Sequence, residues 1–141
     1  MTTHTYVGDL DIQPVVRLQP TVSVAQVARV LADTGTDTVV VDTEPLSEMT
    51  ERGLVAGLAN GATGESLLSE LARAAPQFVH PGTTAELAAT IMIATGRRSL
   101  AVVDESRALG VITLPCLAAV LWSGTSWIGA MRVALHLEGS M

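Results

Sequence analysis

The sequence has few aromatic residues: Phe, Trp and Tyr make up 3% of the 141 residues, whereas 48% of the residues are hydrophobic. A core built from this composition must consist of Val, Leu, Ala and Ile side chains. The chain is too hydrophobic to remain disordered, and it is long enough to bury a substantial core as one domain. The composition therefore favours an α/β protein.

The sequence also lacks an excess of positive charge, a long apolar run and a cysteine pair. Its formal net charge of −6 gives no electrostatic reason to bind nucleic acid or an anionic membrane. The longest apolar runs, such as LAAVLW, are far shorter than the roughly 18 residues of a membrane span. The opening MTTHTYVGDLDIQ has no basic region followed by an apolar one, and Cys116 is the single cysteine. We therefore expect a cytoplasmic protein without nucleic-acid or membrane partners.

Patterns typical of enzymes and metal sites are missing as well. Cys116 has no His or acidic residue at the spacing of a thiol protease, so we expect a small buried hydrophobic residue, although its place near a helix start leaves thiol reactivity open. His4, His80 and His136 are scattered and lack the spacing of zinc ligands. The glycines of GLANGATGE do not fit a phosphate-binding loop. The expectation is a protein without catalytic residues or a bound metal.

An internal repeat is present instead. The segment PTVSVAQVARVLADTG begins at Pro20 and PGTTAELAATIMIATG begins at Pro81, and at this shift their apolar positions coincide. The i, i+3, i+4, i+7 spacing predicts one face of a helix in each half. The predicted buried positions are Val24, Val27, Ala28 and Leu31 in the first half and Ala85, Ala88, Ala89 and Met92 in the second.

Both predicted helices carry start and stop signals. The capping-box pattern occurs at Ser23 with Gln26 and at Thr83 with Glu86. Each helix is expected to end at a glycine, Gly35 or Gly96, because a residue without Cβ adopts the left-handed cap most easily. The chain thus uses one structural unit twice.

Each half is predicted to continue with two strands and a second helix. The expected strands are 38–42 and 54–59 in the first half and 100–104 and 109–113 in the second, and the expected second helices are 66–75 and 116–122. Residues 43–53 are predicted to be a solvated loop or a short helical turn. The predicted units are 10–76 and 77–123, and residues 124–141 form an extension whose pattern fits a strand or a helix.

These features together resemble a tandem pair of CBS domains, also called a Bateman module. The resemblance covers roughly residues 15–122 and is strongest in VHPGTTAELAATIMIATGRRSLAVVDESRALGVIT. It implies two α+β units related by a pseudo-twofold axis, each with a short sheet covered by two helices. It also implies clefts between the units that bind AMP, ADP, ATP or S-adenosylmethionine, a regulatory function, and a disc-like dimer.

The resemblance also implies site residues. In the family motif after the third strand, a Ser or Thr contacts phosphate or ribose, and an Asp three residues later binds the ribose hydroxyls. Thr113 occupies the hydroxyl position and Cys116 the Asp position in the second half; in the first half the matching residues are Asn60 and Thr63. Neither half then retains the ribose-binding carboxylate, and Thr113 has a helix-capping role as its alternative.

Basic residues supply the remaining candidate contacts. Arg97 and Arg98 follow the predicted helix end, where family members often place a basic residue facing phosphate, and guanidinium binds phosphate with two hydrogen bonds. The alternative is a solvated turn whose charges interact with the helix dipole. Asp37, in the matching turn of the first half, is expected to repel phosphate. His80, next to a proline, is expected in a loop or at the rim of the site.

Two functions remain open at this stage. One is a small-molecule sensor that binds an adenosine-type ligand in a single cleft and signals to a protein partner or through its own homodimer. The other is a protein-interaction module that keeps the fold without a ligand. Trp122 and Trp127 either contribute to a dimer or partner surface or cover the end of the core. No cofactor other than such a nucleotide is expected.

Overall fold

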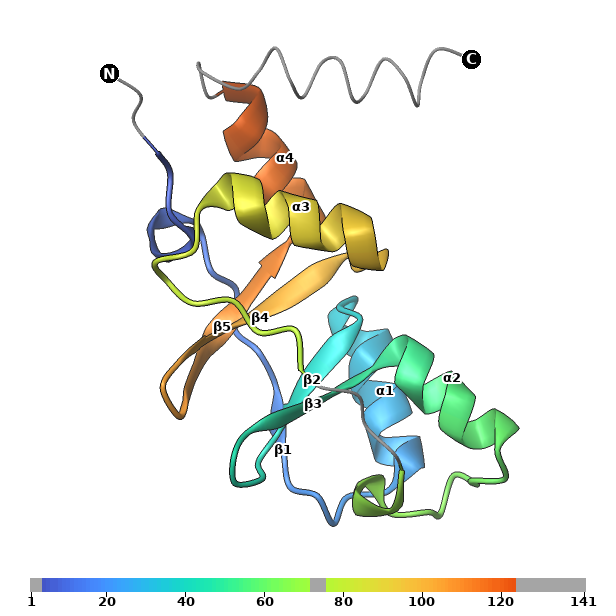
Figure 1. The fold of residues 1–141 in the computed structure, drawn as a ribbon. Helices are drawn as coiled ribbons and strands as arrows, with labels where there is room; N and C mark the ends of the chain where they lie inside the picture. Colours follow the sequence, from blue (N-terminus) through green and yellow to red (C-terminus); the bar gives the residue numbers. More distant parts are fainter. Residues whose placement is uncertain (1–3, 72–75, 124–141) are drawn as a thin grey trace, which may run out of the picture.

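The computed structural model describes residues 4–71 and 76–123, which form two α/β units (Figure 1). The elements of the first unit are β1 (Arg17–Leu18), α1 (Val24–Thr34), β2 (Thr38–Val41), β3 (Ser47–Thr50) and α2 (Glu51–Ala59). The elements of the second unit are α3 (Ala85–Thr95), β4 (Ser99–Asp104), β5 (Arg107–Thr113) and α4 (Leu114–Ser123). Two 3-10 turns, η1 (Val7–Asp9) and η2 (Leu68–Glu70), precede the two units along the chain.

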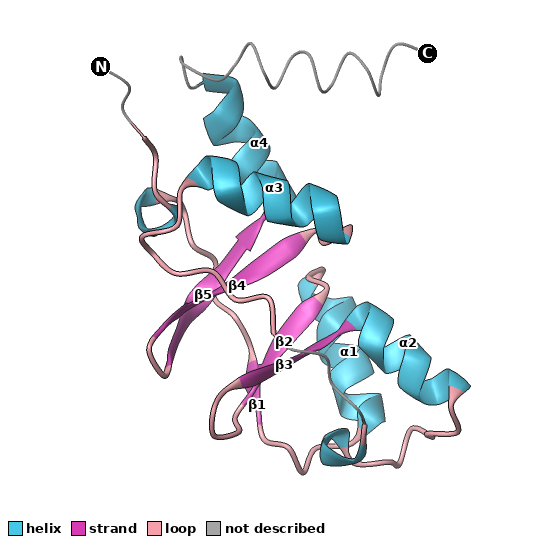
Figure 2. Ribbon diagram, viewed as in Figure 1, coloured by secondary structure: helices cyan, strands magenta, loops and turns pink. Residues whose placement is uncertain are grey.

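The sheets have equivalent topologies. β2 pairs antiparallel with β3 and parallel with β1. β4 pairs antiparallel with β5. Val79 forms a parallel bridge to Val102 of β4, and this bridge corresponds to the parallel pairing of β1 with β2 in the first unit. Figure 2 shows the strands of both units toward the middle of the molecule, with α3 and α4 at one end and α1 and α2 at the other. The predicted mixed α+β architecture of two similar units is confirmed.

The first helix of each unit follows its sequence signals closely. Ser23 forms the predicted capping box with Gln26, and both helices end at left-handed glycines, Gly35 and Gly96. In the second unit the cap is Thr84, one residue after the predicted Thr83, and its side chain accepts a hydrogen bond from the Leu87 N–H. The predicted faces are buried except for Ala28, which is exposed because the α1 surface in contact with the sheet is narrower than expected.

The second half of the first unit differs from the sequence prediction. Residues 54–59, predicted as a strand, belong to helix α2, and residues 47–50, predicted as loop, form strand β3. Of the helix predicted at 66–75, the described part contains the 3-10 turn η2. The extension 124–141 lies outside the described residues, and the unit boundary at 76/77 stays a prediction.

The segments before each unit cross over to the opposite unit. Val7 donates its N–H to the Thr83 carbonyl at 2.7 Å, and its fully buried side chain joins the core of the second unit. Leu68 donates to the Val22 carbonyl at 2.8 Å and is equally buried in the core of the first unit. The two units are therefore interlocked through both entry segments.

The core consists of three hydrophobic clusters. One lies within each unit, between the sheet and its helices. The third cluster joins the two sheets through Val40 of β2 and Ala101 and Val103 of β4. This third cluster fixes the relative position of the units, and the candidate site lies at the ends of these same strands.

Candidate functional site

Two strand–helix junctions lie at the contact between the units and have matching geometry. Thr50 ends β3, and its hydroxyl oxygen accepts the Gly53 N–H at 3.0 Å at the start of α2. Thr113 ends β5, and its hydroxyl oxygen accepts the Cys116 N–H at 3.3 Å at the start of α4. Both threonines also occupy equivalent places in the strand ladders, opposite Thr38 and Ser99.

This symmetry corrects the predicted site in the first unit. Thr50, not Asn60, corresponds to Thr113, and Gly53, not Thr63, corresponds to Cys116. A sequence signal for this junction exists: Thr50 precedes the apolar run of α2 and is a residue type that commonly caps a helix start. Neither Gly53 nor Cys116 carries a carboxylate, so with the corrected alignment the loss of the ribose-binding acid stays a prediction from the family resemblance.

Each junction borders a cavity built from both units. The larger, here called the junction cavity, has a volume of about 320 Å³ and is lined by Gly35, Thr36, Arg98, Ser99, Thr113, Leu114 and Pro115. The smaller cavity, of about 160 Å³, is lined by Asp37, Thr50, Glu51, Arg52, Thr95, Gly96, Arg97 and Arg98. The two linings are related by the repeat, because each combines one strand–helix junction with the helix–strand turn of the other unit.

The two neighbouring arginines have different environments. The Arg97 side chain is 11% exposed, and its Nη1 donates to Glu48 Oε1 at 2.8 Å; the side chain of Glu48 is only 4% exposed. Arg98 is 59% exposed, lines both cavities and reaches Glu51 at 3.5 Å. The predicted pair of phosphate ligands is therefore divided: Arg97 forms a buried ion pair between the units, and Arg98 retains an accessible guanidinium.

Asp37 has a structural partner that the sequence did not indicate. Its residue is 8% exposed, and its carboxylate accepts hydrogen bonds from the Arg98 N–H at 2.9 Å and from the Ser99 hydroxyl. It lines the smaller cavity and not the junction cavity. Its negative charge therefore lies beside the smaller cavity, which Arg97 and Arg98 also line. The prediction that the arginine pair and Asp37 face different clefts is wrong, because both turns meet at the contact between the units.

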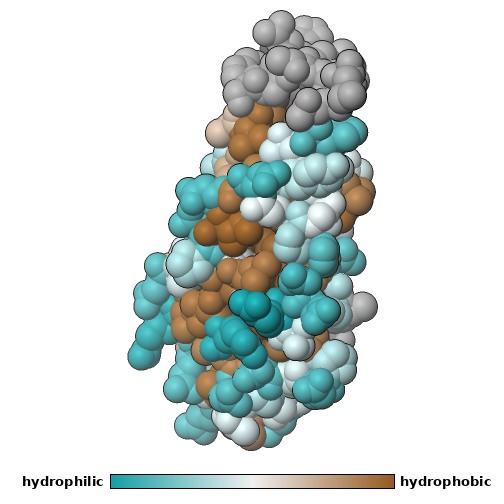
Figure 3. All heavy atoms as spheres, turned by 90° about the vertical axis from the view of Figure 1, so that its left-hand side faces the viewer, coloured by the Kyte–Doolittle hydropathy of each residue, from teal (hydrophilic) through white to brown (hydrophobic). Residues whose placement is uncertain are grey.

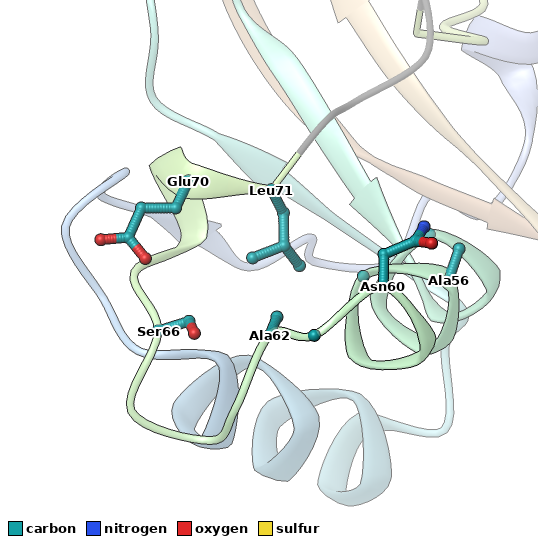
Figure 4. A pocket seen from close by; sticks show the side chains of 9 residues that line it. Ala56, Asn60, Ala62, Ser66, Glu70 and Leu71 are labelled. Atoms are coloured by element: carbon teal, nitrogen blue, oxygen red, sulfur yellow. The ribbon is translucent and has the colours of Figure 1, made fainter.

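Asn60 lies in a third cavity, away from both junctions. It follows the last residue of α2 and contributes to a cavity of about 630 Å³ between this helix and residues 61–71. Figure 4 shows Asn60 on one side of this cavity, with Ser66 and Glu70 on the other. The Glu70 carboxylate accepts the Leu67 N–H at 3.3 Å, so part of this polar lining serves the loop itself.

The other two predicted contact residues have local partners. His80 is a loop residue, as predicted: its Nδ1 accepts the Gly82 N–H at 2.9 Å and its Nε2 lies 3.2 Å from Asp104 Oδ1. Cys116 is partly buried in the first turn of α4, with its sulfur 3.8 Å from the Asp11 carbonyl oxygen. Neither residue is among those lining the two cavities between the units.

The described part of the chain offers no group of three or more His, Cys, Asp or Glu residues that could hold a metal ion. No helix within residues 4–71 and 76–123 is long and apolar enough to cross a membrane. The chemistry of the junction cavity is that of binding. Its lining combines one exposed cation, Arg98, with three hydroxyl groups that already form hydrogen bonds within the protein, those of Thr36, Ser99 and Thr113, and with the first turn of α4.

Comparison with known proteins identifies this arrangement. Residues 68–122 match the family model of the CBS domain. The CBS-domain protein ATU1752 from Agrobacterium tumefaciens has a similar structure, with a TM-score of 0.67 and 24% identity over 83% of this chain and 93% of that protein. The CBS domain-containing protein tm0935 from Thermotoga maritima gives a TM-score of 0.69 and 22% identity, over 87% of this chain and 98% of that one.

A third similar structure contains a ligand. CBSX2 in complex with AMP gives a TM-score of 0.66 and 23% identity, over 82% of this chain and 95% of that one. No curated protein matches the sequence significantly. These likenesses confirm the resemblance to CBS domains on which the sequence analysis relied.

Proposed function

Because the chain carries a CBS domain at residues 68–122 and has the fold of CBS-domain proteins, we propose that it is a regulatory module that binds an adenine nucleotide in the junction cavity. The observation that carries this proposal is Arg98, an accessible guanidinium in a cavity that both units build. A similar protein, CBSX2, has been solved with AMP. Binding between two units gives a ligand direct influence on how the units are held together.

The chemistry of the cavity favours a phosphorylated ligand. Arg98 can exchange its exposed ion pair with Glu51 for a phosphate, because such a surface pair contributes only about 0–1 kcal/mol. The dipole of α4 at its start, Leu114 and Pro115, also favours an anion. The volume of about 320 Å³ is at the lower end of small-molecule sites.

The missing carboxylate shapes the expected ligand preference. With Cys116 in the position that the CBS resemblance assigns to Asp, the ribose lacks its usual acceptor, so phosphate contacts must supply most of the affinity. We therefore expect the order ATP, ADP, AMP, adenosine, from tightest to weakest. S-adenosylmethionine, which has a cationic sulfonium and no phosphate, is expected to bind more weakly than ATP because it would face Arg98.

Thermal unfolding with each of these ligands tests the proposal. A ligand present at 100 times its dissociation constant adds about 2.7 kcal/mol to the free energy of unfolding. We expect ATP to raise the melting temperature most, adenosine least, and Arg98→Ala to remove the difference. Arg52→Ala is the matched control, because it deletes an exposed arginine of the smaller cavity. Equal stabilisation by ATP and adenosine in the unsubstituted protein would contradict the proposal.

A protein-interaction module is the second candidate. Its support is the exposure of large apolar side chains on three helices: Val55 and Leu58 on α2, Leu87 and Ile93 on α3, and Leu114 on α4. A second apolar feature lies on the face at the left of Figure 1, where Figure 3 shows hydrophobic residues gathered in a band among polar ones. A lack of stabilisation by every nucleotide, together with a stable dimer or partner complex, would favour this function.

A further inference from the structure

Asp37 is a buried carboxylate of the first unit that accepts hydrogen bonds from two residues of the second unit. Its Oδ2 accepts the Arg98 N–H at 2.9 Å, and its Oδ1 accepts the Ser99 hydroxyl. The residue is 8% exposed. A hydrogen bond to a charged group in such a site is stronger than one between neutral groups, so this contact holds its donors firmly.

These bonds fix the backbone from which the Arg98 side chain extends. The Arg98 N–H is held by Asp37, and the Arg98 carbonyl accepts the Leu114 N–H at 2.9 Å. Both polar groups of its backbone are therefore bound, whereas its side chain is 59% exposed and lines the junction cavity. The position of the guanidinium depends on this anchored turn, because the side chain itself has few contacts to restrain it.

From this arrangement we propose that Asp37 is a positioning residue for Arg98 and sets phosphate recognition in the junction cavity from the opposite unit. The inference rests on the proposed function for its ligand, but the anchoring itself can be tested without one. Asp37 does not line the junction cavity, so its contacts reach a ligand there through Arg98 and the neighbouring Ser99, which do line it.

The chain offers a matched control for a general loss of contact between the units. Glu48 is a second carboxylate of the first unit, 6% exposed, and it binds Arg97 at 2.8 Å. Glu48→Gln weakens a comparably buried inter-unit contact without touching Arg98. If Asp37→Ala acts by weakening the contact between the units in general, Glu48→Gln should have the same effect. If it acts by releasing Arg98, Glu48→Gln should not have that effect.

Amide hydrogen exchange tests the anchoring directly. In Asp37→Ala the Arg98 N–H loses its acceptor, and we expect it to exchange at least about tenfold faster than in the unsubstituted protein. Ser99→Ala, a milder variant for the case in which Asp37→Ala does not fold, should change it in the same direction. Glu48→Gln should leave it unchanged. An unchanged Arg98 exchange rate in folded Asp37→Ala or in Ser99→Ala would overturn the proposal, whether or not a nucleotide binds.

Calorimetry with ATP and adenosine tests the consequence. We expect Asp37→Ala to weaken ATP binding about tenfold and adenosine binding less than twofold, which is the size of one lost charge-assisted contact. In an Arg98→Ala background, Asp37→Ala should change ATP affinity less than twofold, because the group that it positions is gone. A full tenfold effect in that background would overturn the positioning role. If neither ligand binds the unsubstituted protein, the proposed function fails and the exchange experiment alone decides this inference.

Discussion

Among single residues, the adjacent arginines Arg97 and Arg98 have different structural roles. Arg97 and Arg98 are indistinguishable in the sequence, but one pairs with buried Glu48 and the other lines the junction cavity. The buried pair carries a desolvation cost that only its close geometry offsets. Two of the Arg97 nitrogens, Nε and Nη2, are buried with no hydrogen-bond partner among the described residues. Arg97 therefore acts as a link between the units, and the exposed Arg98 is the residue available to a ligand.

Cys116 provides a prediction at this scale. Its sulfur approaches a carbonyl oxygen at 3.8 Å and has no basic partner among the described hydrogen bonds, so a hydroxyl can replace the thiol. We expect Cys116→Ser to leave ATP affinity unchanged in calorimetry and to change the unfolding free energy by about 1 kcal/mol or less. Loss of ATP binding in a Cys116→Ser protein of normal stability would assign the thiol to the site instead.

Among the helices and strands, the sequence predicts correctly the ones in which buried apolar residues recur at a regular spacing. The first helix of each unit, with its cap and its final glycine, follows directly from apolar spacing. The sequence does not predict strand β3, because Glu48 stands at a buried strand position. A carboxylate is tolerable there because Glu48 pairs with the distant Arg97 and accepts hydrogen bonds from the Thr38 hydroxyl and the Gln77 N–H. The short apolar run LVAGLA predicts a strand where the structure has helix α2, because such runs fit either structure. The misplaced junction then shifted the predicted site from Thr50 to Asn60.

Gly110 in β5 tests the docking of the N-terminal segment. A Cβ on this residue would lie 2.4 Å from the Gln13 carbonyl oxygen and 2.3 Å from the Ile12 Cγ2. Gly110→Ala must therefore push the segment from its bridge to the strand, and we expect it to lower the unfolding free energy by about 2 kcal/mol or more. In the control Gly64→Ala, the new Cβ makes an ordinary 3.5 Å contact, and stability should hardly change. Denaturant titration that finds the two variants equally stable would argue against a close-packed segment.

The contact between β1 and the end of β2 predicts a dependence on pH. Hydrogen bonds from Arg17 and then Gln19 lower the pKa of the Asp42 carboxyl below its usual value. The resulting stabilisation is complete above the unfolded-state pKa of this group and is lost as pH falls through its lower folded-state pKa. The melting temperatures of the unsubstituted protein and Arg17→Ala should therefore differ at neutral pH and converge in acid.

Arg29→Ala serves as the control for that experiment, because it removes an exposed arginine of α1. It should not produce a difference that disappears in acid. A difference between Arg17→Ala and the unsubstituted protein that stays constant down to the lowest pH at which both fold would contradict the assignment.

At the scale of the whole molecule, the two units are joined by exchanged entry segments, a shared hydrophobic cluster and buried polar contacts. The repeat itself is readable from the sequence, because both copies preserve the same helix spacing. The sequence does not predict which unit each entry segment packs against, because the residues around Val7 and Leu68 would have the same apolar pattern in either unit. Both cavities of the candidate site exist only because the units are held in this arrangement.

The outer surface of the molecule predicts self-association. Large apolar side chains are exposed on α2, α3 and α4, with Ile93 at 63% and Val55 at 60% exposure. Such side chains are a common feature of protein interfaces. We expect light scattering to give twice the 14.7 kDa mass of one chain at micromolar concentrations. The mass of a single chain throughout this range would contradict a homodimer.

Calorimetric titration with ATP tests whether the junction cavity binds a nucleotide by its phosphates through Arg98. We predict one ATP per chain and, in Arg98→Ala, a loss of affinity for ATP that adenosine does not share. The smaller cavity should stay empty, because its volume of about 160 Å³ is half that of the junction cavity and the carboxylates of Asp37 and Glu51 lie beside its arginines. Two ATP molecules per chain, or an unchanged ATP affinity in Arg98→Ala, would contradict the account.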